Sequence, residues 1–336
     1  MTSPLPVLKG PVRLVHLAAA VLTLSVLLLI PFGVLTRTRE ALSDMVHAPA
    51  FGALALLIVA WIVGRRPTAD GSQPPPAATS PAWSLERVCL AVWVGVSVSG
   101  ALSEVVQGLV GRGRSLHDAV SNSLGAAAFL LMYLAFRSEQ PAKRRRLCGA
   151  AFAALGAAWF VPLAALADVW RQHREVPQLA GFERAAELDR WVLHHANMSR
   201  SPYHASQGRW SAEIACEPGH FAAVVLRMAD LDWRGYDALE FDLYLPQALP
   251  NPMYLKVVDR HYDGRPYDRY DAPLVLRAGA NHMRIPLAEI VAGPQGRPLD
   301  LARIWWLELY LIDSPLPIEF SLDNLRLTQV PVVIGG

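Results

Sequence analysis

The sequence has little charge and few cysteines for a chain of 336 residues. Charged residues make up only 18% of it and hydrophobic residues 53%, which excludes an ordinary soluble protein along the whole length. The formal net charge of +2 gives no basic excess, so nothing indicates a nucleic-acid partner. The three cysteines, Cys89, Cys148 and Cys216, form no framework, and we expect no disulfide. The ten histidines show no zinc-site spacing.

Long apolar runs fill the first half of the chain. A spanning helix needs about 20 predominantly apolar residues. The first run follows Lys9 and Arg13, but no small-residue cleavage site comes after it, so we interpret it as a retained span and not as a signal peptide. Five runs meet the length and predict five transmembrane helices: Val12–Phe32, Val46–Val63, Val88–Val110, Ala119–Phe136 and Leu147–Ala167.

The distribution of Lys and Arg predicts the orientation of these spans. With a cytoplasmic N-terminus, the inside ends carry the excess of basic residues, including the run Lys143, Arg144, Arg145 and Arg146. Residues 65–83, rich in Pro, Ala and Ser, then form a flexible inside linker. Five spans place the C-terminal half outside the cytoplasm. We therefore expect a multi-pass membrane protein with lipid as a partner.

Polar and ionisable residues gather near the predicted outer ends of three spans. Such groups at membrane depth usually face the bundle interior and often mark function. The alternative is that they only cap and pack the helices. As catalytic candidates we take Glu104 or His47 as general base and Asp118 beside them. The whole polar membrane cluster consists of Asp44, His47, Glu104, Gln107, Arg112, Arg114, Asp118 and Asn122.

The order of these residues carries a resemblance. The pattern D-x2-H-x3-F-x2-L from Asp44, then E-x2-Q from Glu104, an arginine loop and D-x3-N-x2-G from Asp118 resembles the VanZ-like membrane protein family over about residues 10–137. The departures are Met45, where the family often has a basic residue, and the choice between Arg112 and Arg114 for the family arginine. The resemblance implies a bacterial cytoplasmic (inner) membrane protein whose founding members are linked to glycopeptide-antibiotic resistance.

From Gly181 onward, short segments alternate between apolar and polar residues and are separated by Gly, Pro, Asp and Asn. This pattern predicts an antiparallel β-sandwich. The predicted strands include "WSAEIAC", "FAAVVLRM", "ALEFDLYL", "MYLKVVD", "HMRIPLAEI", "IWWLELYLI" and "IEFSLDNLRL". The segments "LDWRGYDALEFDLYLP", "RPLDLARIWWLELYL" and "FSLDNLRL" resemble galactose-binding-like jelly rolls, which include carbohydrate-binding modules, over about residues 180–330. That resemblance implies a binding module, sometimes with a structural calcium ion, and rarely a catalyst.

Candidate ligand-binding residues lie in the stretch "DRHYDGRPYDRYD". Aromatic rings stack on sugar faces and charged groups bond hydroxyls, so His261, Tyr262, Tyr267 and Tyr270 are candidates for a glycan site. The alternative is a solvated hairpin whose tyrosines cover the edge of the sandwich. Trp305 and Trp306 would point to opposite faces of a strand, so we expect at least one of them in the core. Asp323 is the candidate calcium ligand, or else it caps a turn.

These observations predict an α-helical membrane bundle of five helices followed by an all-β jelly-roll sandwich. The expected parts are a VanZ-like four-helix membrane domain (1–137), a fifth helix and linker (138–175), a carbohydrate-binding-like sandwich (176–330) and a tail (331–336). The leading interpretation is recognition or handling of an envelope glycan or glycopeptide by an extracytoplasmic domain. The alternatives are a membrane-interface enzyme that acts on a lipid-linked envelope precursor, and a structural anchor that displays the sandwich. No motif decides whether the protein is an enzyme.

Overall fold

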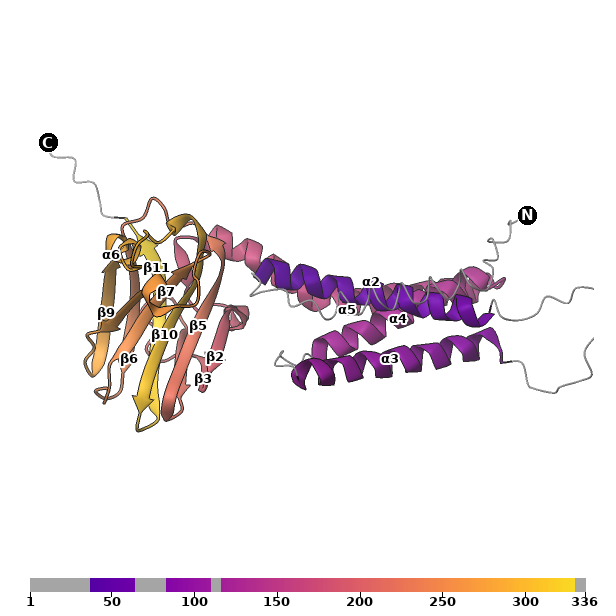
Figure 1. Ribbon diagram of the computed structural model, residues 1–336, viewed down its shortest axis with the longest axis horizontal. Coiled ribbons are helices and arrows are strands. Elements are labelled where there is room, and N and C mark those ends of the chain that lie inside the picture. The colour runs from indigo at the N-terminus through magenta and orange to yellow at the C-terminus, as the bar shows by residue number, and fades with distance from the viewer. Residues whose placement is uncertain (1–36, 64–82, 110–115, 330–336) are drawn as a thin grey trace, which may run out of the picture. The chain divides into compact units, whose positions relative to one another are not determined.

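The computed structural model describes residues 37–63, 83–109 and 116–329, without some side chains between residues 104 and 116 (Figure 1). The chain divides into two compact units. The described helices within Arg39–Ala165 belong to the first unit, and the second unit comprises the described residues from Leu166 onward together with Arg37 and Thr38. The domain boundaries given above stay predictions.

The first unit is helical, as predicted. The segment 12–32, predicted as the first span, lies outside the described residues, so the count of five spans is not confirmed. Four described helices are long and apolar enough to cross a membrane: α2 (Arg37–Val63), α3 (Leu85–Leu109), α4 (Leu116–Arg137) and α5 (Pro141–Glu175). Each contains one of the other predicted spans, except that Val110, the last residue of the span predicted within α3, lies outside the described residues.

Two prolines explain how side chains join α2, α4 and α5. Proline has no N–H and therefore frees the carbonyl four residues earlier in a helix. Pro49 of α2 frees the carbonyl of Met45, which accepts a hydrogen bond from Trp159 Nε1 at 3.0 Å. Pro162 of α5 frees the carbonyl of Ala158, which lies 3.5 Å from the hydroxyl Oγ of Ser121 on α4. Neighbouring helices thus satisfy backbone groups that lipid could not.

Small residues let the helices approach one another closely. A Cβ atom on Gly125 of α4 would collide with the backbone carbonyl of Ala48 on α2, so only glycine fits there. Between α3 and α4, Ser97 Oγ donates to Ser123 Oγ at 2.8 Å, and Trp93 Nε1 donates to the Ser123 carbonyl at 3.1 Å. The apolar core of this unit consists of Phe51, Ala55, Val59, Val88, Cys89, Val92, Val96, Ala126 and Leu130.

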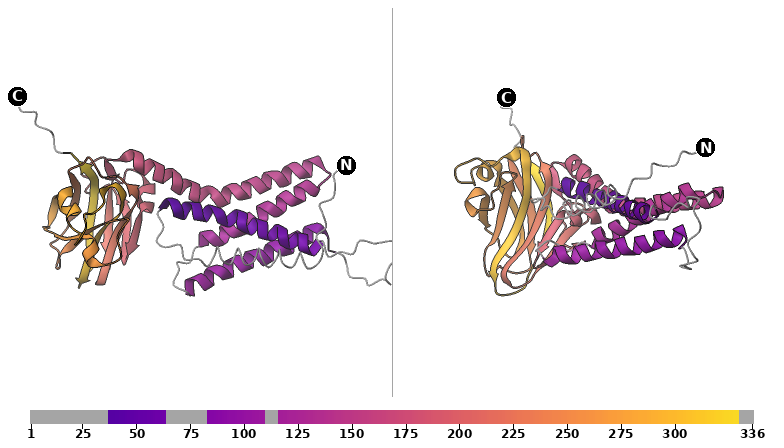
Figure 2. Two further views of the ribbon diagram at one scale, coloured as in Figure 1. Left: turned by 45° about the horizontal axis from the view of Figure 1, so that its top comes forward. Right: turned by 45° about the vertical axis from the view of Figure 1, so that its right-hand side comes forward.

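The second unit contains the predicted antiparallel β-sandwich (Figures 1 and 2). The six-stranded sheet has the order β3-β4-β11-β6-β9, with β1 also paired to β11, and the five-stranded sheet has the order β2-β5-β10-β7-β8. The strands are β1 (Gln178–Ala180), β2 (Trp191–His194), β3 (Ala196–Ser201), β4 (Ser211–Cys216), β5 (Gly219–Leu231), β6 (Ala238–Leu245), β7 (Met253–Asp259), β8 (Tyr270–Leu274), β9 (Gly279–Pro286), β10 (Ile304–Ser314) and β11 (Ile318–Thr328). Short helices add η1 (Ala185–Arg190), η2 (Pro266–Asp268), η3 (Leu301–Arg303) and α6 (Leu287–Val291).

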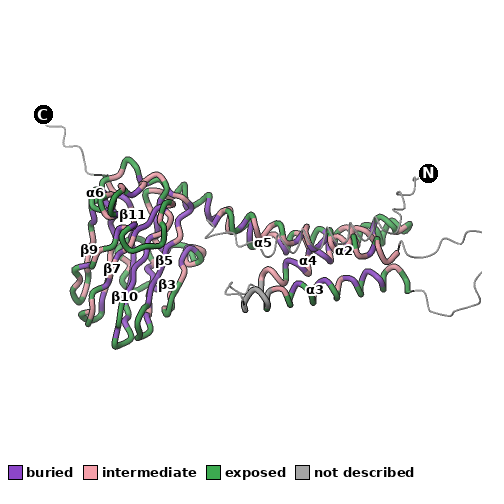
Figure 3. Tube along the Cα trace, in the orientation of Figure 1, coloured by how far each residue is buried: buried purple, intermediate pink, exposed green. Residues whose placement is uncertain are grey.

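The core lies between the two sheets, and burial alternates along much of the strands (Figure 3). Leu307, Leu309 and Leu311 of β10 point into this core. An irregularity in the pairing between Ile304 and Trp306 interrupts the alternation, as a β-bulge does. The prediction that Trp305 or Trp306 belongs to the core is therefore wrong: both are partly exposed, and their ring centroids lie 4.4 Å apart.

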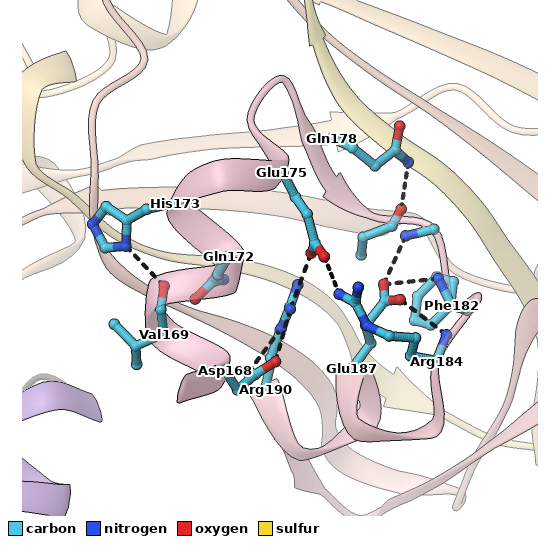
Figure 4. Close-up of polar contacts among 12 residues, drawn as sticks. Asp168, Val169, Gln172, His173, Glu175, Gln178, Phe182, Arg184, Glu187 and Arg190 are labelled. Atoms are coloured by element: carbon cyan, nitrogen blue, oxygen red, sulfur yellow. Dashed lines mark hydrogen bonds and ion pairs between the residues drawn. The ribbon is translucent and has the colours of Figure 1, made fainter. Parts of the chain in front are cut away.

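A buried ion network joins the last turns of α5 to the sandwich within the second unit (Figure 4). Arg190, at the end of η1, has no exposed surface. Its Nε and Nη2 donate to the two carboxylate oxygens of Asp168 at 3.0 and 2.9 Å, and Nη2 also donates to Glu175 at 3.1 Å. Arg37, which clusters with this unit, donates to Asp168 at 2.8 Å. Because Asp168 and Glu175 lie on α5, the end of this helix is part of the sandwich unit.

Replacing Asp168 with Asn should destabilise the sandwich strongly, because Arg190 would keep its buried charge without its main partner. Removing one member of a buried ion pair costs about 3–5 kcal/mol. The measurement is thermal unfolding of the detergent-solubilised chain, followed by the far-ultraviolet β-sheet signal. Asp232→Asn is the matched control, because it breaks an exposed pair with Arg234 and should cost at most about 1 kcal/mol. Equal midpoints for the two variants would contradict the assigned role of the network.

Candidate functional site

Aromatic side chains cross the outer face of the five-stranded sheet in one row. Tyr254 of β7 lies opposite Tyr310 of β10, Tyr310 lies opposite Ala223 of β5, and Ala223 lies opposite His194 of β2. The two tyrosine rings stack with centroids 5.2 Å apart and an interplanar angle of 17°. Phe221 extends the row: its ring centroid is 5.9 Å from that of Tyr310 and 6.2 Å from that of His194. The row runs across the strands, because it follows the pairing register.

A charged row lies two residues further along the same strands. Asp271 of β8 pairs with Lys256 of β7, and Lys256 pairs with Glu308 of β10. Lys256 Nζ donates to Glu308 Oε2 at 2.8 Å, and the two side chains are 14% and 6% exposed. Burial of this extent makes the pair costly unless it is fully bonded. An ion pair is therefore held beside the aromatic row.

The two rows are bonded to each other. The Tyr310 hydroxyl donates to Asp271 Oδ1 at 2.7 Å, and Arg269 donates to the other carboxylate oxygen. Burial, together with this bond to a carboxylate, raises the pKa of Tyr310, so its hydroxyl stays a donor at neutral pH. Asp271 is thus fixed at the edge of the face by two donors.

Trp306 and Tyr262 lie beside the charged row. The ring of Tyr262 meets that of Trp306 edge to face, with centroids 5.6 Å apart and an angle of 88°. Lys256 Nζ is 5.6 Å from the Trp306 centroid and 5.8 Å from the Tyr262 centroid, which are cation–π distances. We call the whole set the aromatic face; it consists of His194, Phe221, Tyr254, Lys256, Tyr262, Asp271, Trp306, Glu308 and Tyr310.

The ligand candidates from the sequence are placed in different surroundings. Of these, Tyr262 belongs to the aromatic face. Tyr270 packs into the core between the two sheets, so its ring does not lie on the outer face of the five-stranded sheet. Tyr267 is 42% exposed and lies beside Arg265. The exposed His261 lies 3.6 Å from the Asp300 carboxylate.

Sequence reasoning missed most of the aromatic face. Tyr254 and Lys256 alternate with core residues in "MYLKVVD", and Trp306, Glu308 and Tyr310 do so in "IWWLELYLI". This alternation signals that they share the outer face of their strands. The pairing of β7 with β10 brings these five side chains together. The sequences of the two strands do not by themselves reveal that the strands pair.

The membrane candidates whose side chains the structure describes lie on α2 and α4, and Glu104 and Gln107 lie on α3. His47 Nδ1 lies 3.2 Å from Oδ1 of the fully buried Asn122, and Asp44 interacts electrostatically with Asp118 and His47. The structure therefore brings four members of the polar membrane cluster together. The side chains of Glu104 and Gln107, and residues Arg112 and Arg114, lie outside the described part.

Asp323, the calcium candidate, lies on β11 beside the loop between β3 and β4. Its Oδ2 accepts hydrogen bonds from the backbone N–H groups of Ser206 and Gln207 at 2.7 and 2.9 Å. Within the described residues, the buried Oδ1 of Asp323 and Oδ1 of Asn324 have no hydrogen-bond partner. Burial raises the pKa of Asp323 despite the two backbone bonds. Asp242 lies next to them and accepts a bond from Asn324 Nδ2 at 3.0 Å.

No protein-family model matches the chain, and no curated protein sequence matches it. Solved structures similar to part of it include a family 11 carbohydrate-binding module from Clostridium thermocellum in complex with a β-1,3-1,4-mixed-linked tetrasaccharide (14% identity, 46% of this chain and 95% of that chain, TM-score 0.37). Two others are an exo-β-agarase (15% identity, 46% of this chain and 25% of that chain, TM-score 0.39) and the family 30 module of a C. thermocellum cellulosomal cellulase (13% identity, 40% of this chain and 83% of that chain, TM-score 0.32). Identities and scores this low assign no activity, so function is argued from the side chains.

The segment that carries Tyr262 is closed by two carboxylates and one arginine. Arg297 donates through Nη1 and Nη2 to the fully buried Asp259, at the end of β7. Its Nε donates to Asp268 in η2, just before β8. Asp268 Oδ2 also accepts from the backbone N–H of Asp263 at 2.8 Å. Arg297 therefore links the two ends of the segment 259–268.

Asp268 should contribute stability that is lost in acid. The bonds from Arg297, followed by the backbone bond of Asp263, hold the pKa of Asp268 below its usual range. A depressed pKa stabilises the fold above the unfolded value of about 3.9, and this contribution disappears as pH falls through the folded value. Asp268→Asn should therefore unfold at a lower temperature than the wild type near pH 6, and the difference between the two midpoints should shrink as pH falls below about 4. Thermal scans across that pH range check this, and a constant difference between the midpoints would contradict it.

Proposed function

We propose that the sandwich binds a polysaccharide chain across the aromatic face. The observation that carries the proposal is the cross-strand row of Tyr254, Tyr310, Phe221 and His194 beside buried, hydrogen-bonded charges. Aromatic rings cover the apolar C–H faces of sugars, and the row offers Phe221, His194 and Tyr254, which are exposed or partly exposed, whereas Tyr310 is 7% exposed and packs beside them. The fixed Lys256–Glu308 pair and Asp271 offer donors and acceptors to hydroxyls. The proposed binding site therefore lies on the sheet and not on the tyrosine-rich stretch predicted from the sequence. Tyr262 is the residue common to both.

The face suits an uncharged oligosaccharide. Its cations Lys256 and Arg269 are each paired with a carboxylate, Glu308 and Asp271, so no net charge is left to attract an ionic sugar. Neighbouring strands lie about 4.8 Å apart, so the row from β7 to β2 is about 14 Å long. That length favours a chain of several sugars over a single one.

We further propose that the helices hold this binding domain at a bacterial cytoplasmic (inner) membrane, with lipid around them. The apolar length of α2, α3, α4 and α5 supports this. With residues 12–32 as an additional span, a cytoplasmic N-terminus places the sandwich outside the cytoplasm, as the Lys and Arg distribution predicts. The protein would then handle an envelope glycan or glycopeptide.

A second candidate function is a membrane-interface enzyme acting on a lipid-linked envelope precursor. The contact between His47 and Asn122, with Asp44 and Asp118 beside them, favours it, because ionisable groups within a membrane bundle often mark function. The VanZ-like order of residues supports the same site. A structural anchor that displays the sandwich is the third candidate, and it predicts neither glycan binding nor turnover.

The test of glycan binding uses Trp306→Ala and Tyr254→Ala in the detergent-solubilised chain. The first probe is a β-1,3-1,4-mixed-linked tetrasaccharide, followed by a panel of neutral polysaccharides in affinity electrophoresis. Loss of a stacked ring should cost about 1–2 kcal/mol, or five- to thirty-fold in affinity. The control is Tyr203→Ala, whose ring is 72% exposed on the loop after β3, outside the aromatic face.

Each outcome separates the candidate functions. Weaker binding by the two face variants but not by Tyr203→Ala supports the proposal. Absence of binding to every probe by the wild-type chain sinks it and leaves the anchor or the enzyme. Turnover of lipid-linked precursor that depends on His47 would support the enzyme.

We also propose that calcium binds beside Asp323. The buried Oδ1 atoms of Asp323 and Asn324 fit the carboxylate and amide oxygens that calcium takes. Among the described residues, no group of three His, Cys, Asp or Glu side chains is placed to hold a metal, so backbone oxygens or water would complete the set. A cation there would stabilise the fold by binding only its folded state.

Chelation should then lower the thermal midpoint of the wild-type sandwich, and added calcium should restore it. Asp323→Asn should respond less to either treatment, because it removes the charged ligand. An unchanged midpoint on chelation would contradict the proposal that calcium binds beside Asp323.

A further inference from the structure

We propose that Arg297 is a positioning residue that sets ligand affinity from outside the aromatic face. It does so by holding the segment 259–268, which carries Tyr262 against Trp306. This inference rests on the proposed glycan-binding function, and it adds a residue that no aromatic pattern would find.

The first step is the closure of the segment. One guanidinium group bonds two carboxylates that lie nine positions apart in the chain, Asp259 and Asp268. Asp259 is fully buried, and its oxygens also accept the backbone N–H groups of His261 at 3.0 Å and Asp300 at 2.7 Å. The Gln295 N–H donates to the Tyr267 carbonyl at 2.7 Å. The segment is thus fastened both to the end of β7 and to the neighbouring loop that contains Arg297.

The second step leads from this closure to the face. The Tyr262 N–H donates to the carbonyl of Asp259 at 3.2 Å, so the backbone of Tyr262 is held next to the carboxylate that Arg297 bonds. Its hydroxyl lies 3.4 Å from Arg269 Nη1. The ring is then edge-on to Trp306 and near the ammonium group of Lys256. A small rotation of the segment would move the Tyr262 ring and so change the surface that the aromatic face presents to a sugar.

The third step is the chemistry of arginine. The planar fork of Arg297 makes bidentate bonds to Asp259 while Nε remains for Asp268, a geometry that the single ammonium group of lysine does not reproduce. Hydrogen bonds to both carboxylates raise the pKa of Arg297, in keeping with a cation held tightly between two anions. Arg297→Lys therefore keeps the charge and loses the fork, which separates positioning from simple charge compensation.

The experiment is a double-mutant cycle on the full chain, with the β-1,3-1,4-mixed-linked tetrasaccharide, or whichever neutral polysaccharide the wild type binds, as probe. Arg297→Lys should weaken binding about five- to tenfold in the wild-type background. In the Tyr262→Ala background, Arg297→Lys should change affinity by less than about twofold, because the ring that Arg297 positions is absent. Arg284→Lys, at an ion pair with Glu240 on the six-stranded sheet, is the matched control and should leave affinity unchanged.

A second readout separates positioning from general destabilisation. Hydrogen exchange of the unliganded chain should rise within 260–269 in Arg297→Lys and stay unchanged in β4 and β6. If Arg297→Lys does not fold, Asp268→Asn takes its place in the cycle, because it releases only one end of the segment. An equal loss of affinity with and without Tyr262, or no loss at all, would overturn the inference while the glycan site stands. Failure of the wild type to bind any probe would overturn both.

Discussion

The bidentate bond between Arg190 and Asp168 is the interaction on which the second unit depends. It places a fully buried cation at the end of η1 and supplies its counter-ion from α5. Without α5, the charge would remain in the interior without its main partner, which proteins tolerate poorly. A sandwich cut at Pro177 would lack this partner. The aromatic face, Asp323 and the segment closed by Arg297 therefore all belong to a unit that begins within a helix.

The helical unit meets a related constraint with different groups. A chain that crosses lipid must satisfy its own backbone, and the two prolines leave the carbonyls of Met45 and Ala158 without their usual donors. Trp159 and Ser121 reach these carbonyls from other helices. The carbonyls that proline leaves free in one helix thus form hydrogen bonds with a neighbouring helix. In both units, a polar group without a partner on its own element is satisfied by another element. The Met45 carbonyl of α2 accepts from Trp159 of α5, and Arg190 of the sandwich pairs with Asp168 of α5.

Local patterns predicted the elements better than the site. Apolar length and strand alternation are properties of one segment, so four spans and the β-sandwich could be predicted. The strand predicted to run on to Ile290 ends at Pro286, where α6 begins. The aromatic face depends on the register between strands far apart in the chain, and the irregular pairing between Ile304 and Trp306 leaves Trp305 outside the core as well as Trp306. The sequence predicts Tyr270 as a ligand residue only because it is aromatic, but its position in β8 places its ring in the core.

The continuity of α5 with the sandwich has a mechanical consequence. Only Val176 and Pro177 separate the end of α5 from β1, and Asp168 and Glu175 fasten the helix to Arg190 before that point. A polysaccharide held on the aromatic face would transmit its tension through the sheet into Arg190 and from there into α5. The load would be shared between these ionic bonds and the two-residue connection. Within the second unit, the sheet is therefore held in a fixed orientation to the end of α5.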